Sequence, residues 1–578
     1  MSARRPAPQL LSLLVLALLS ACDGNAATTG QSELRELVLS SAPPEDPGSH
    51  LMGPARFSQR ETLEQIAELA KNKSVSGLLL RIGPLAGAWA RQAELRDALL
   101  TVRATKKPVH CYFENTDNVG YGLLARVCDR ITMTPTGTLS LVGVHAEIVY
   151  ARDLLETLGL HAEVMQVGRF KGAADLFTRS DMPIETEQTM GALLDDLQHD
   201  LTSAVSQGRS LTAADLTRAI DQGPDTAQTA LSLRLIDAIG FDDEARAQAK
   251  ASTHAQRVVL MPEHPEVERK GLFELIKTLT SSESEEPAHG KRIALAYLEG
   301  TIGDSDDDSG SFSNAGPFVK AMRHIADDVD VRALVLRIQS PGGSALASDK
   351  MWHAVRRVAH RKPVIVSIGD MAASGGYYVA CAGNEIMAQR TSLVGSIGVV
   401  GGKIVGEQLA QRLGVHVAVL SRGKNAAWLS PTQRFSDSER AALVRALQST
   451  YDTFLSRVSE GRHLHGERLN AVAEGRLMTG ERARVGGLVD SEGGLLQALA
   501  RARTKAGVGA DAAIEVWPRQ RNFLDRIAHM VSGASAYSAG VQGLHALLPG
   551  AFDAPLASLL LGGSAGAFAA LPFGLEIH

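Results

Sequence analysis

The chain has 578 residues, of which 44% are apolar and 21% are charged, and its formal net charge is −5. This composition is typical of a globular protein, and the length exceeds what one ordinary core organises, so we expect at least two domains. The sequence contains no long block of basic residues. Nothing in it therefore points to nucleic acid as a partner.

The first 22 residues have the pattern of a secretory signal. Arg4 and Arg5 precede an apolar run, Leu10–Leu19, that is too short to span a membrane. The run leads into Leu-Ser-Ala-Cys, which resembles a bacterial lipobox and indicates lipidation of Cys22. The alternative is a plain secretory signal with a chance cysteine. We expect residues 1–22 to be a signal peptide and a lipid on Cys22 to hold the protein at a membrane of the cell envelope, facing the periplasm.

Three further cysteines follow, Cys111, Cys128 and Cys381. Their number is odd and no CxxC spacing occurs, so we expect neither a disulfide framework nor a zinc site. Buried free thiols are the preferred interpretation. No cluster of His, Asp and Glu has the spacing of metal ligands, and we expect no metal.

The chain contains an internal repeat. The stretch 108–164 matches 363–419 at a constant offset of 255, which is 363 minus 108. After a two-residue gap the offset becomes 253, and Lys171 then faces Lys424. One register sustained over so many identities indicates a tandem duplication.

The duplication defines the expected domain organisation. The stretch between the copies is rich in Pro, Glu, Ser and Lys, as linkers are, and the sequence after about residue 505 has no counterpart in the repeat. The predicted parts are a signal peptide (1–22), a first repeat that has lost part of its motifs (33–261), a linker (262–291), a second repeat (292–505) and an apolar extension (506–578).

Each copy shows strands that alternate with helices. Residues 77–82 and 333–338 are short continuous apolar runs, as expected for parallel strands buried on both faces. In the second copy a helical segment follows at 349–360, and another strand at 363–368. This alternation predicts an α/β fold in which parallel sheets carry flanking helices.

Three glycine-bearing turns follow strands of the second copy. They are Ser-Pro-Gly-Gly-Ser at 340–344, Asp-Met-Ala-Ala-Ser-Gly-Gly-Tyr-Tyr at 370–378 and Gly-Ser-Ile-Gly at 395–398. Glycine lets backbone N–H groups approach a bound oxygen, and a serine between glycines can project its hydroxyl into a cleft. Each turn alone is a weak signal, because most turns of this kind contain glycine for packing reasons.

The motifs taken together resemble a known family. SPGGS, MAASGGYY, GSIG and Gly168-Arg-Phe-Lys171, in a duplicated α/β chain, are similar to the long form of bacterial signal peptide peptidase A, within the Clp protease and crotonase superfamily. The resemblance covers roughly residues 55–500. It implies tandem Clp/crotonase-like repeats, no cofactor, a homo-tetramer and a serine endopeptidase that cleaves remnant signal peptides or other short hydrophobic peptides at the membrane.

The resemblance also implies roles for individual residues. Ser396 is the expected nucleophile and Lys171 the expected general base. Gly343, together with the N–H of Ser396, is the expected oxyanion hole. Three neighbouring residues are expected to line the substrate cleft, namely Gly342, Ser374 and Gly375.

The lysine needs a particular environment to serve as a base. A serine hydroxyl is a poor nucleophile until a base takes its proton, and a lysine can do so only if burial lowers its pKa. Phe170 and Ala173 beside Lys171 are apolar enough to allow that. A solvent-facing lysine is the alternative for any single lysine.

Comparison of the two copies indicates a split site. Ser396 aligns with Leu141 and Ser374 with Val119, so the first copy supplies no nucleophile. It does supply Lys171. The second copy keeps Lys424 at the equivalent position, and Lys424 is the alternative base.

The sequence is also compatible with other functions. Ser374 in Ala-Ala-Ser resembles the Clp protease serine, which gives an alternative nucleophile. The glycine turns also suit a crotonase-type acyl-CoA enzyme, although a secreted lipoprotein has little access to acyl-CoA. A catalytically inactive membrane scaffold is the non-enzyme alternative. ATP is not implied, because Gly402-Lys403 is followed by Ile404 rather than Ser or Thr.

Overall fold

A computed structural model of the chain describes residues 32–45, 56–85, 87–262, 290–305, 313–518 and 568–569. The predicted signal peptide with Cys22, all but the ends of the predicted linker, and most of the predicted extension lie outside the described residues. None of the described helices combines the length and the apolar character needed to cross a bilayer.

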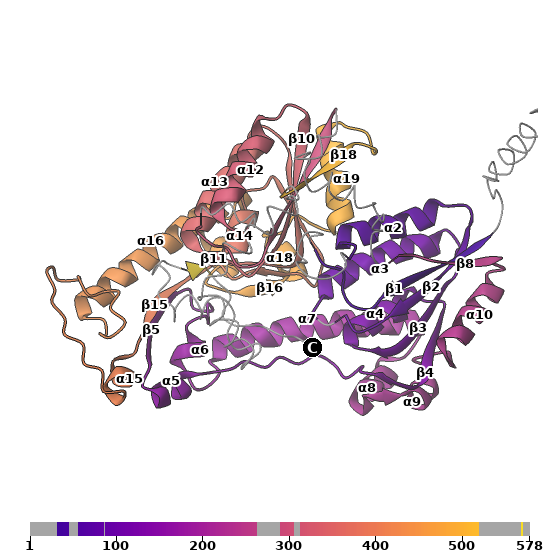
Figure 1. Ribbon diagram of the computed structural model, residues 1–578, viewed down its shortest axis with the longest axis horizontal. Helices are drawn as coiled ribbons and strands as arrows, with labels where there is room; N and C mark the ends of the chain where they lie inside the picture. Colours follow the sequence, from indigo (N-terminus) through magenta and orange to yellow (C-terminus); the bar gives the residue numbers. More distant parts are fainter. Residues whose placement is uncertain are drawn as a thin grey trace, which may run out of the picture.

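The first repeat is built on a seven-stranded sheet with the order β6-β4-β3-β2-β1-β8, in which β7 also pairs with β4. Its central strands are parallel and alternate with helices, as predicted (Figure 1). Residues 77–82 lie within β2, which is almost entirely buried. The strands are β1 (Glu33–Leu39), β2 (Val75–Ile82), β3 (Val109–Thr116), β4 (Arg130–Leu139), β6 (Asp225–Thr226), β7 (Ala238–Ile239) and β8 (Arg257–Leu260). The helices of this body are α2 (Gln59–Lys71), α3 (Trp89–Ala104), α4 (Asn118–Val127), α8 (Ala213–Gln222), α9 (Ala227–Ser232) and α10 (Asp242–Ser252).

The second repeat has an eight-stranded sheet with the order β16-β14-β12-β10-β9-β18, and β13 pairs with both β12 and β17. Residues 333–338 and 363–368 lie in or at the start of the parallel neighbours β10 and β12, which confirms the predicted α/β architecture. The strands are β9 (Arg292–Glu299), β10 (Val331–Ser340), β12 (Val364–Ala373), β13 (Glu385–Ala388), β14 (Leu393–Gly395), β16 (Leu477–Thr479), β17 (Ser491–Glu492) and β18 (Ala513–Trp517). The helices are α12 (Ala315–Asp327), α13 (Ala345–Ala359), α14 (Gly375–Ala380), α17 (Gly466–Val472), α18 (Gly480–Val485) and α19 (Leu495–Ala506).

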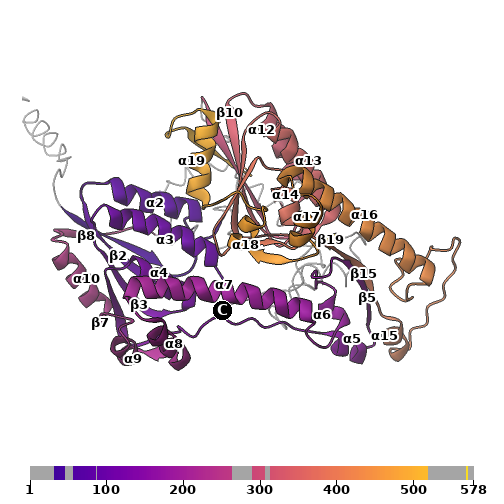
Figure 2. The same ribbon diagram turned by 180° about the vertical axis from the view of Figure 1, so that it is seen from behind.

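Each repeat also extends an arm beyond its sheet (Figures 1 and 2). The arm of the second repeat ends in a long helix that begins with a capping box, in which Ser436 and Glu439 satisfy each other's backbone N–H groups. The arm of the first repeat consists of α5 (Arg152–Leu158), β5 (His161–Val167), α6 (Asp175–Thr178) and α7 (Ile184–Arg209), and that of the second of β15 (Val399–Val405), α15 (Glu407–Arg412) and α16 (Asp437–Arg462).

The two arms join through a small sheet. β5 of the first repeat pairs antiparallel with β15 of the second along seven residues of each strand. The full order of this sheet is β11-β19-β15-β5, where β11 is Gly343–Ser344 and β19 is Phe568–Ala569. The pairing carries the chain that follows β5 from the first repeat into the second.

A buried ion-pair network joins the bodies of the two repeats. Arg337 on β10 bridges Glu45 and Glu94 of the first repeat, at 2.7 Å in each case, and all three side chains are buried. Asp370 on β12 accepts hydrogen bonds from the backbone N–H of Ala90 and from the Arg91 side chain. These contacts therefore hold β10 and β12, the strands that lead into the turns at 340–344 and 370–378, in place against the first repeat.

The cysteine prediction was wrong in one respect. Cys111 on β3 and Cys128 at the end of α4 form a disulfide, with their Cα atoms 5.9 Å apart. The odd number of cysteines did not exclude a pair, because the strand and the following helix pack together and bring two thiols into reach while the third stays elsewhere. Cys381 is buried and free, as expected.

Candidate active site

Ser396 lies in a tight turn directly after β14. It is fully buried, and its φ of 51° is in the left-handed region, where a residue other than glycine is strained. Gly395 before it also has a positive φ, of 105°. The backbone N–H of Ser396 donates to the carbonyl of Arg476 at 2.6 Å, which fixes the turn.

Ser374 occupies a second strained turn beside the first. It is the residue before α14, with φ 55° and ψ −116°, and it is fully buried. Its N–H donates to the carbonyl of Gly395 at 2.7 Å, so the two serine turns are held together. Non-glycine residues with such backbone angles persist only where the surrounding structure enforces them, and they gather at functional sites.

Lys171 reaches both serines from the other repeat. It follows β5, and its Nζ lies 2.6 Å from Ser374 Oγ, 3.1 Å from Ser396 Oγ and 2.9 Å from the Ser396 carbonyl oxygen. The side chain is completely buried. Residues separated by more than 200 positions in the sequence thus form one cluster within a single chain.

Two glycines of the second repeat make room for this lysine. A Cβ on Gly398 would lie 2.9 Å from Lys171 Cδ, and a Cβ on Gly475 would lie 2.4 Å from the Lys171 backbone. The N–H of Gly475 donates to the Ile397 carbonyl, and the N–H of Phe170 donates to the Glu474 carbonyl, both at 2.7 Å. The segment at 474–476 was not singled out from the sequence, yet it holds both the lysine and the Ser396 turn.

Burial sets the protonation of the lysine. Desolvation holds the pKa of Lys171 well below its ordinary value, because an ammonium ion is costly where water is excluded. Its three hydrogen-bond partners are all uncharged oxygens of serines. A neutral amine has two N–H donors and one lone pair, which matches three such neighbours.

The turn at 340–344 approaches the same region from β10. Gly342 and Gly343 have φ of 104° and 154°, and a Cβ on Gly343 would lie 2.1 Å from the Ile302 carbonyl oxygen, so only glycine fits there. The Gly342 N–H donates to Ser340 Oγ at 3.2 Å. Gly375, the first residue of α14, is buried next to Ser374.

One part of the expected oxyanion hole does not match the structure. The N–H of Ser396 was expected to face a bound oxygen together with that of Gly343, but it is engaged with the Arg476 carbonyl. The strained backbone of Ser396 turns this N–H toward the neighbouring segment. Gly343 remains as the candidate donor.

An extended chain segment already lies beside this turn. β19 pairs antiparallel with β11 through Gly343 and Ser344, and with β15 through Val400. The gap between β11 and β15 therefore accommodates a strand by backbone pairing.

Lys424 does not join the cluster. It is exposed, in the connection between α15 and α16, within a run of exposed residues from 411 to 426. Of the two lysines at equivalent positions, only Lys171 contacts the serines.

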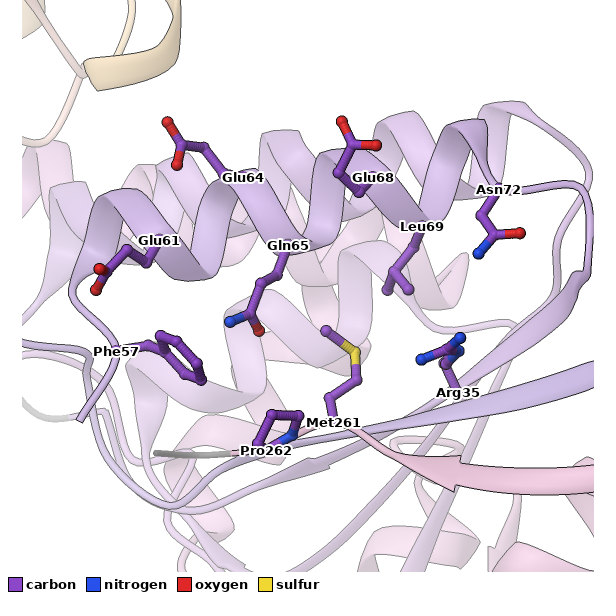
Figure 3. Close-up of a pocket in the computed structure, with 10 residues that line it drawn as sticks. All are labelled: Arg35, Phe57, Glu61, Glu64, Gln65, Glu68, Leu69, Asn72, Met261 and Pro262. Atoms are coloured by element: carbon purple, nitrogen blue, oxygen red, sulfur yellow. The ribbon is translucent and has the colours of Figure 1, made fainter. Parts of the chain in front are cut away.

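Another pocket, of about 480 Å³, lies in the first repeat (Figure 3). Glu61, Glu64 and Glu68 of α2 line one side, and Phe57 and Met261 lie on the other. Its lining contains no serine, cysteine, histidine or lysine. It therefore offers no nucleophile and no counterpart of the Lys171 cluster.

Comparisons with known proteins identify the family of the chain. The model of peptidase family S49 matches residues 101–256 and 356–509, once in each repeat and over more than half of the chain. The chain is 28% identical to the chloroplastic serine protease SPPA of Arabidopsis thaliana over 459 residues, which cover 78% of this chain and 67% of that protein. It is also 28% identical over 516 residues to Protease 4 of Salmonella typhi, covering 87% of this chain and 79% of that protein. For Protease 4 of Haemophilus influenzae the identity is again 28% over 516 residues, with 86% and 80% covered.

Proposed function

Because this chain belongs to peptidase family S49 and is a serine protease of the signal peptide peptidase type, we propose that Ser396 is its nucleophile and Lys171 its general base. The observation that carries the proposal is the fully buried Nζ of Lys171, 3.1 Å from Ser396 Oγ. That separation is within reach of direct proton transfer.

The reaction follows from this geometry. Neutral Lys171 takes the proton of Ser396 as Oγ attacks the scissile carbonyl carbon, and a tetrahedral oxyanion forms. The ammonium then gives the proton to the departing amine, which leaves an acyl ester on Ser396. Water attacks the ester with Lys171 again accepting a proton, and the return of that proton to Oγ releases the carboxylic acid product.

Two neighbours support these steps. Ser374 Oγ, 2.6 Å from Nζ, orients the amine so that its lone pair faces Ser396. The N–H of Gly343 is the proposed donor to the oxyanion, because Gly343 lies in the glycine turn after β10 and the N–H of Ser396 is engaged with the Arg476 carbonyl.

The substrate would bind as an extended peptide between β11 and β15. The pairing of β19 with both strands supports this mode, in which backbone hydrogen bonds give affinity and side-chain pockets give selectivity. The proposed substrates are remnant signal peptides and other short hydrophobic peptides. A lipid on Cys22 would hold the enzyme at the periplasmic side of a bacterial envelope membrane, close to such peptides.

A second candidate assigns the nucleophile to Ser374. Its Oγ is closer to Nζ than that of Ser396, 2.6 Å against 3.1 Å, and its backbone is equally strained. We favour Ser396 because it has a hydroxyl between two glycines of the GSIG turn and because Ser374 is then free to orient the lysine.

Peptide hydrolysis and labelling by a fluorophosphonate probe test the assignment. We expect Ser396→Ala and Lys171→Ala to lower kcat by about a hundred-fold to ten-thousand-fold, and Lys424→Ala, the matched control, to leave it unchanged. Labelling should disappear in Ser396→Ala and persist in Ser374→Ala. The reverse pattern would support Ser374 as the nucleophile, and no labelling of the wild type would support the inactive scaffold.

The pH profile tests the base separately. Only the neutral amine accepts the proton, and burial lowers the pKa of Lys171. Activity should therefore rise with pH through that lowered pKa and reach its plateau below the range of an ordinary lysine. A flat profile from acid to alkali would contradict a lysine base.

A further inference from the structure

The segment 474–476 lies between the turn that carries the proposed base and the turn that carries the proposed nucleophile. On one side, the carbonyl of Arg476 accepts a hydrogen bond from the N–H of Ser396 at 2.6 Å. On the other side, the carbonyl of Glu474 accepts one from the N–H of Phe170 at 2.7 Å. One short segment therefore fixes the two turns relative to each other.

The side chain of Glu474 adds a second hydrogen bond to the turn of the base. Its Oε2 accepts from the backbone N–H of Arg169 at 3.1 Å, so the two N–H groups that precede Lys171 in the chain both donate to Glu474. Before them, a Cβ on Gly168 would lie 2.9 Å from the carbonyl carbon of Glu474. The three residues that precede the lysine are thus all packed against one glutamate.

Glu474 has a backbone conformation that the surrounding structure must support. Its φ of 60° is in the left-handed region, which is uncommon for a glutamate. Tyr451 on α16 gives that support, because its hydroxyl donates to Glu474 Oε1 and accepts from the Glu474 N–H, both at 3.2 Å. Tyr451 is buried, and burial raises its pKa to about 12, so the hydroxyl keeps its proton. We call Tyr451 and Glu474 the brace.

The residues of the first repeat that are equivalent to the brace are used differently. At the offset of 253, Glu474 corresponds to Asp221 and Tyr451 to Gln198. Asp221 is exposed and has the regular backbone of α8, and Gln198 accepts a hydrogen bond from the N–H of Val144. The brace therefore belongs to the repeat whose serines contact Lys171.

We propose that the brace is a pair of positioning residues: it holds the amine of Lys171 within reach of Ser396 Oγ and acts through the lysine rather than on the substrate. The proposal rests on the assignment of Lys171 as the general base. Removal of the Glu474 carboxylate takes the acceptor away from the Arg169 N–H and from the Tyr451 hydroxyl, so the turn that carries the amine is held less firmly. Proton transfer needs hydrogen-bond reach, so the chemical step is affected more than substrate binding.

Steady-state peptide hydrolysis tests the brace. We expect Glu474→Ala to lower kcat by about ten-fold to a hundred-fold with KM little changed, because a misplacement of about 1 Å at a reacting group costs on the order of a hundred-fold. Tyr451→Phe removes one hydroxyl and keeps the carboxylate, so it should lower kcat by less. Glu474→Gln keeps an amide oxygen as an acceptor and should recover part of the loss seen in Glu474→Ala.

The first repeat offers matched controls. Asp221→Ala removes the carboxylate at the position equivalent to Glu474, and Tyr121→Phe removes the hydroxyl of a buried tyrosine that donates to the Leu235 carbonyl at 2.6 Å. Both should leave kcat unchanged, even where Tyr121→Phe lowers the melting temperature. The proposal would be overturned by a Glu474→Ala variant with the kcat of the wild type, and equally by a Tyr121→Phe variant that loses as much kcat as Tyr451→Phe.

The pH dependence of fluorophosphonate labelling separates positioning from a loss of stability. Burial lowers the pKa of Lys171. Charged and titratable side chains pack around its turn, namely Arg169, Glu185, Tyr451, Glu474 and Arg476. A loosened turn admits water to the amine, so in Glu474→Ala the pKa of Lys171 should rise toward its ordinary value and the midpoint of labelling should move to higher pH.

The other two outcomes of this titration would overturn the proposal. A variant that is only destabilised keeps the wild-type midpoint. A midpoint at lower pH would mean that the charge of Glu474 acts directly on the amine, because loss of a nearby negative charge favours the neutral form of a lysine.

Lys171→Ala, measured in the same series, keeps the failure of this proposal distinct from the failure of the proposed function. If Lys171→Ala is inactive while Glu474→Ala matches the wild type, the dyad stands and the brace is wrong. If Lys171→Ala retains the activity of the wild type, the assignment of the base itself is wrong.

Discussion

The two repeats share one backbone plan and differ at the positions that carry chemistry. Ser374 and Ser396 in the second repeat correspond to Val119 and Leu141 in the first, and all four side chains are buried. A buried hydroxyl needs a hydrogen-bond partner, and Lys171 supplies one for both serines. In the first repeat apolar residues fill the same places, and the equivalent lysine of the second repeat, Lys424, is exposed.

A second pair of equivalent positions shows how contact between the repeats changes the burial of an arginine side chain. Arg81 on β2 corresponds to Arg337 on β10. The Arg81 side chain is 30% exposed and lies 3.3 Å from Glu36, whereas that of Arg337 is 1% exposed because the first repeat covers it. The equivalent arginines therefore differ: Arg81 forms a half-buried ion pair, and Arg337 is the centre of a buried ion-pair network.

Arg337→Met should show the largest difference between the repeats. Removal of the guanidinium leaves the buried Glu94 without its counter-ion and Glu45 with only Arg91, 4.0 Å away, and breaking a buried pair costs about 3–5 kcal/mol. Arg81→Met is the matched control and should cost about 1 kcal/mol or less, since Arg81 is itself partly exposed and its buried partner Glu36 keeps its ion pair with Arg246. Urea unfolding followed by far-UV circular dichroism measures both.

The pH dependence of the variant distinguishes buried charge from lost packing. Burial already raises the pKa of Glu94, and Arg337 opposes that rise. Without Arg337 the carboxyl would bind a proton more strongly in the folded state than in the unfolded state, so the stability of the variant should increase as the pH falls toward 5. Equal costs for the two substitutions at all pH values would contradict this account of the network.

The disulfide is a second difference between the repeats, and we expect it to have a smaller effect on stability. Cys111 and Cys128 correspond to Val366 and Gly383, and in the second repeat the valine methyl occupies the space beside that glycine. Loss of a cross-link between residues 17 apart should cost about 3 kcal/mol, because the unfolded chain gains freedom. Cys111→Ala with Cys128→Ala should therefore lower the melting temperature, and a reductant should lower that of the wild type but not that of the variant. Equal melting temperatures with and without reductant would show that the disulfide does not stabilise the first repeat.

The sequence was informative where the signal was local. Continuous apolar runs predicted β2 and β10, and the constant offset predicted the duplication that the two S49 matches confirm. Contacts between distant segments left no such signal. The approach of Ser374 to Lys171 and the disulfide partner of Cys111 depend on how helices and strands pack, and the count of cysteines carries no information on that.

The close packing of Gly398 and Gly475 against Lys171, called the lysine clamp below, was also not predicted from the sequence, although one signal pointed to it. Gly475 follows α17, and Gly223, which aligns with the next residue Arg476 at the offset of 253, follows the equivalent helix α8 of the first repeat. A glycine near the end of the same helix in each copy indicates a close approach of backbone. Which chain approaches it depends on the docking of the two arms, and only the structure identifies Lys171.

Gly398→Ala tests the lysine clamp, and the same substitution at Gly143, the equivalent position of the first repeat, is the comparison. The new methyl would lie 2.9 Å from both Lys171 Cδ and the Val167 carbonyl oxygen, so the lysine side chain must shift from its position beside Ser396. A displacement of about 1 Å at a reacting group costs on the order of a hundred-fold in kcat. Gly143→Ala, at the position equivalent to Gly398, meets only the Ile220 methyl and the Gln198 side chain and should leave kcat unchanged, although its positive φ of 80° makes alanine cost about 1–2 kcal/mol of stability.

Kinetics and unfolding measured on the same two variants separate the effects. Gly398→Ala should lose activity with KM little changed, because the displaced group acts on the nucleophile rather than on substrate binding. Gly143→Ala should lose stability and keep activity. If both substitutions lower kcat equally, the close approach at Gly398 does not position the lysine. The difference between the repeats at these glycines would then need another physical origin.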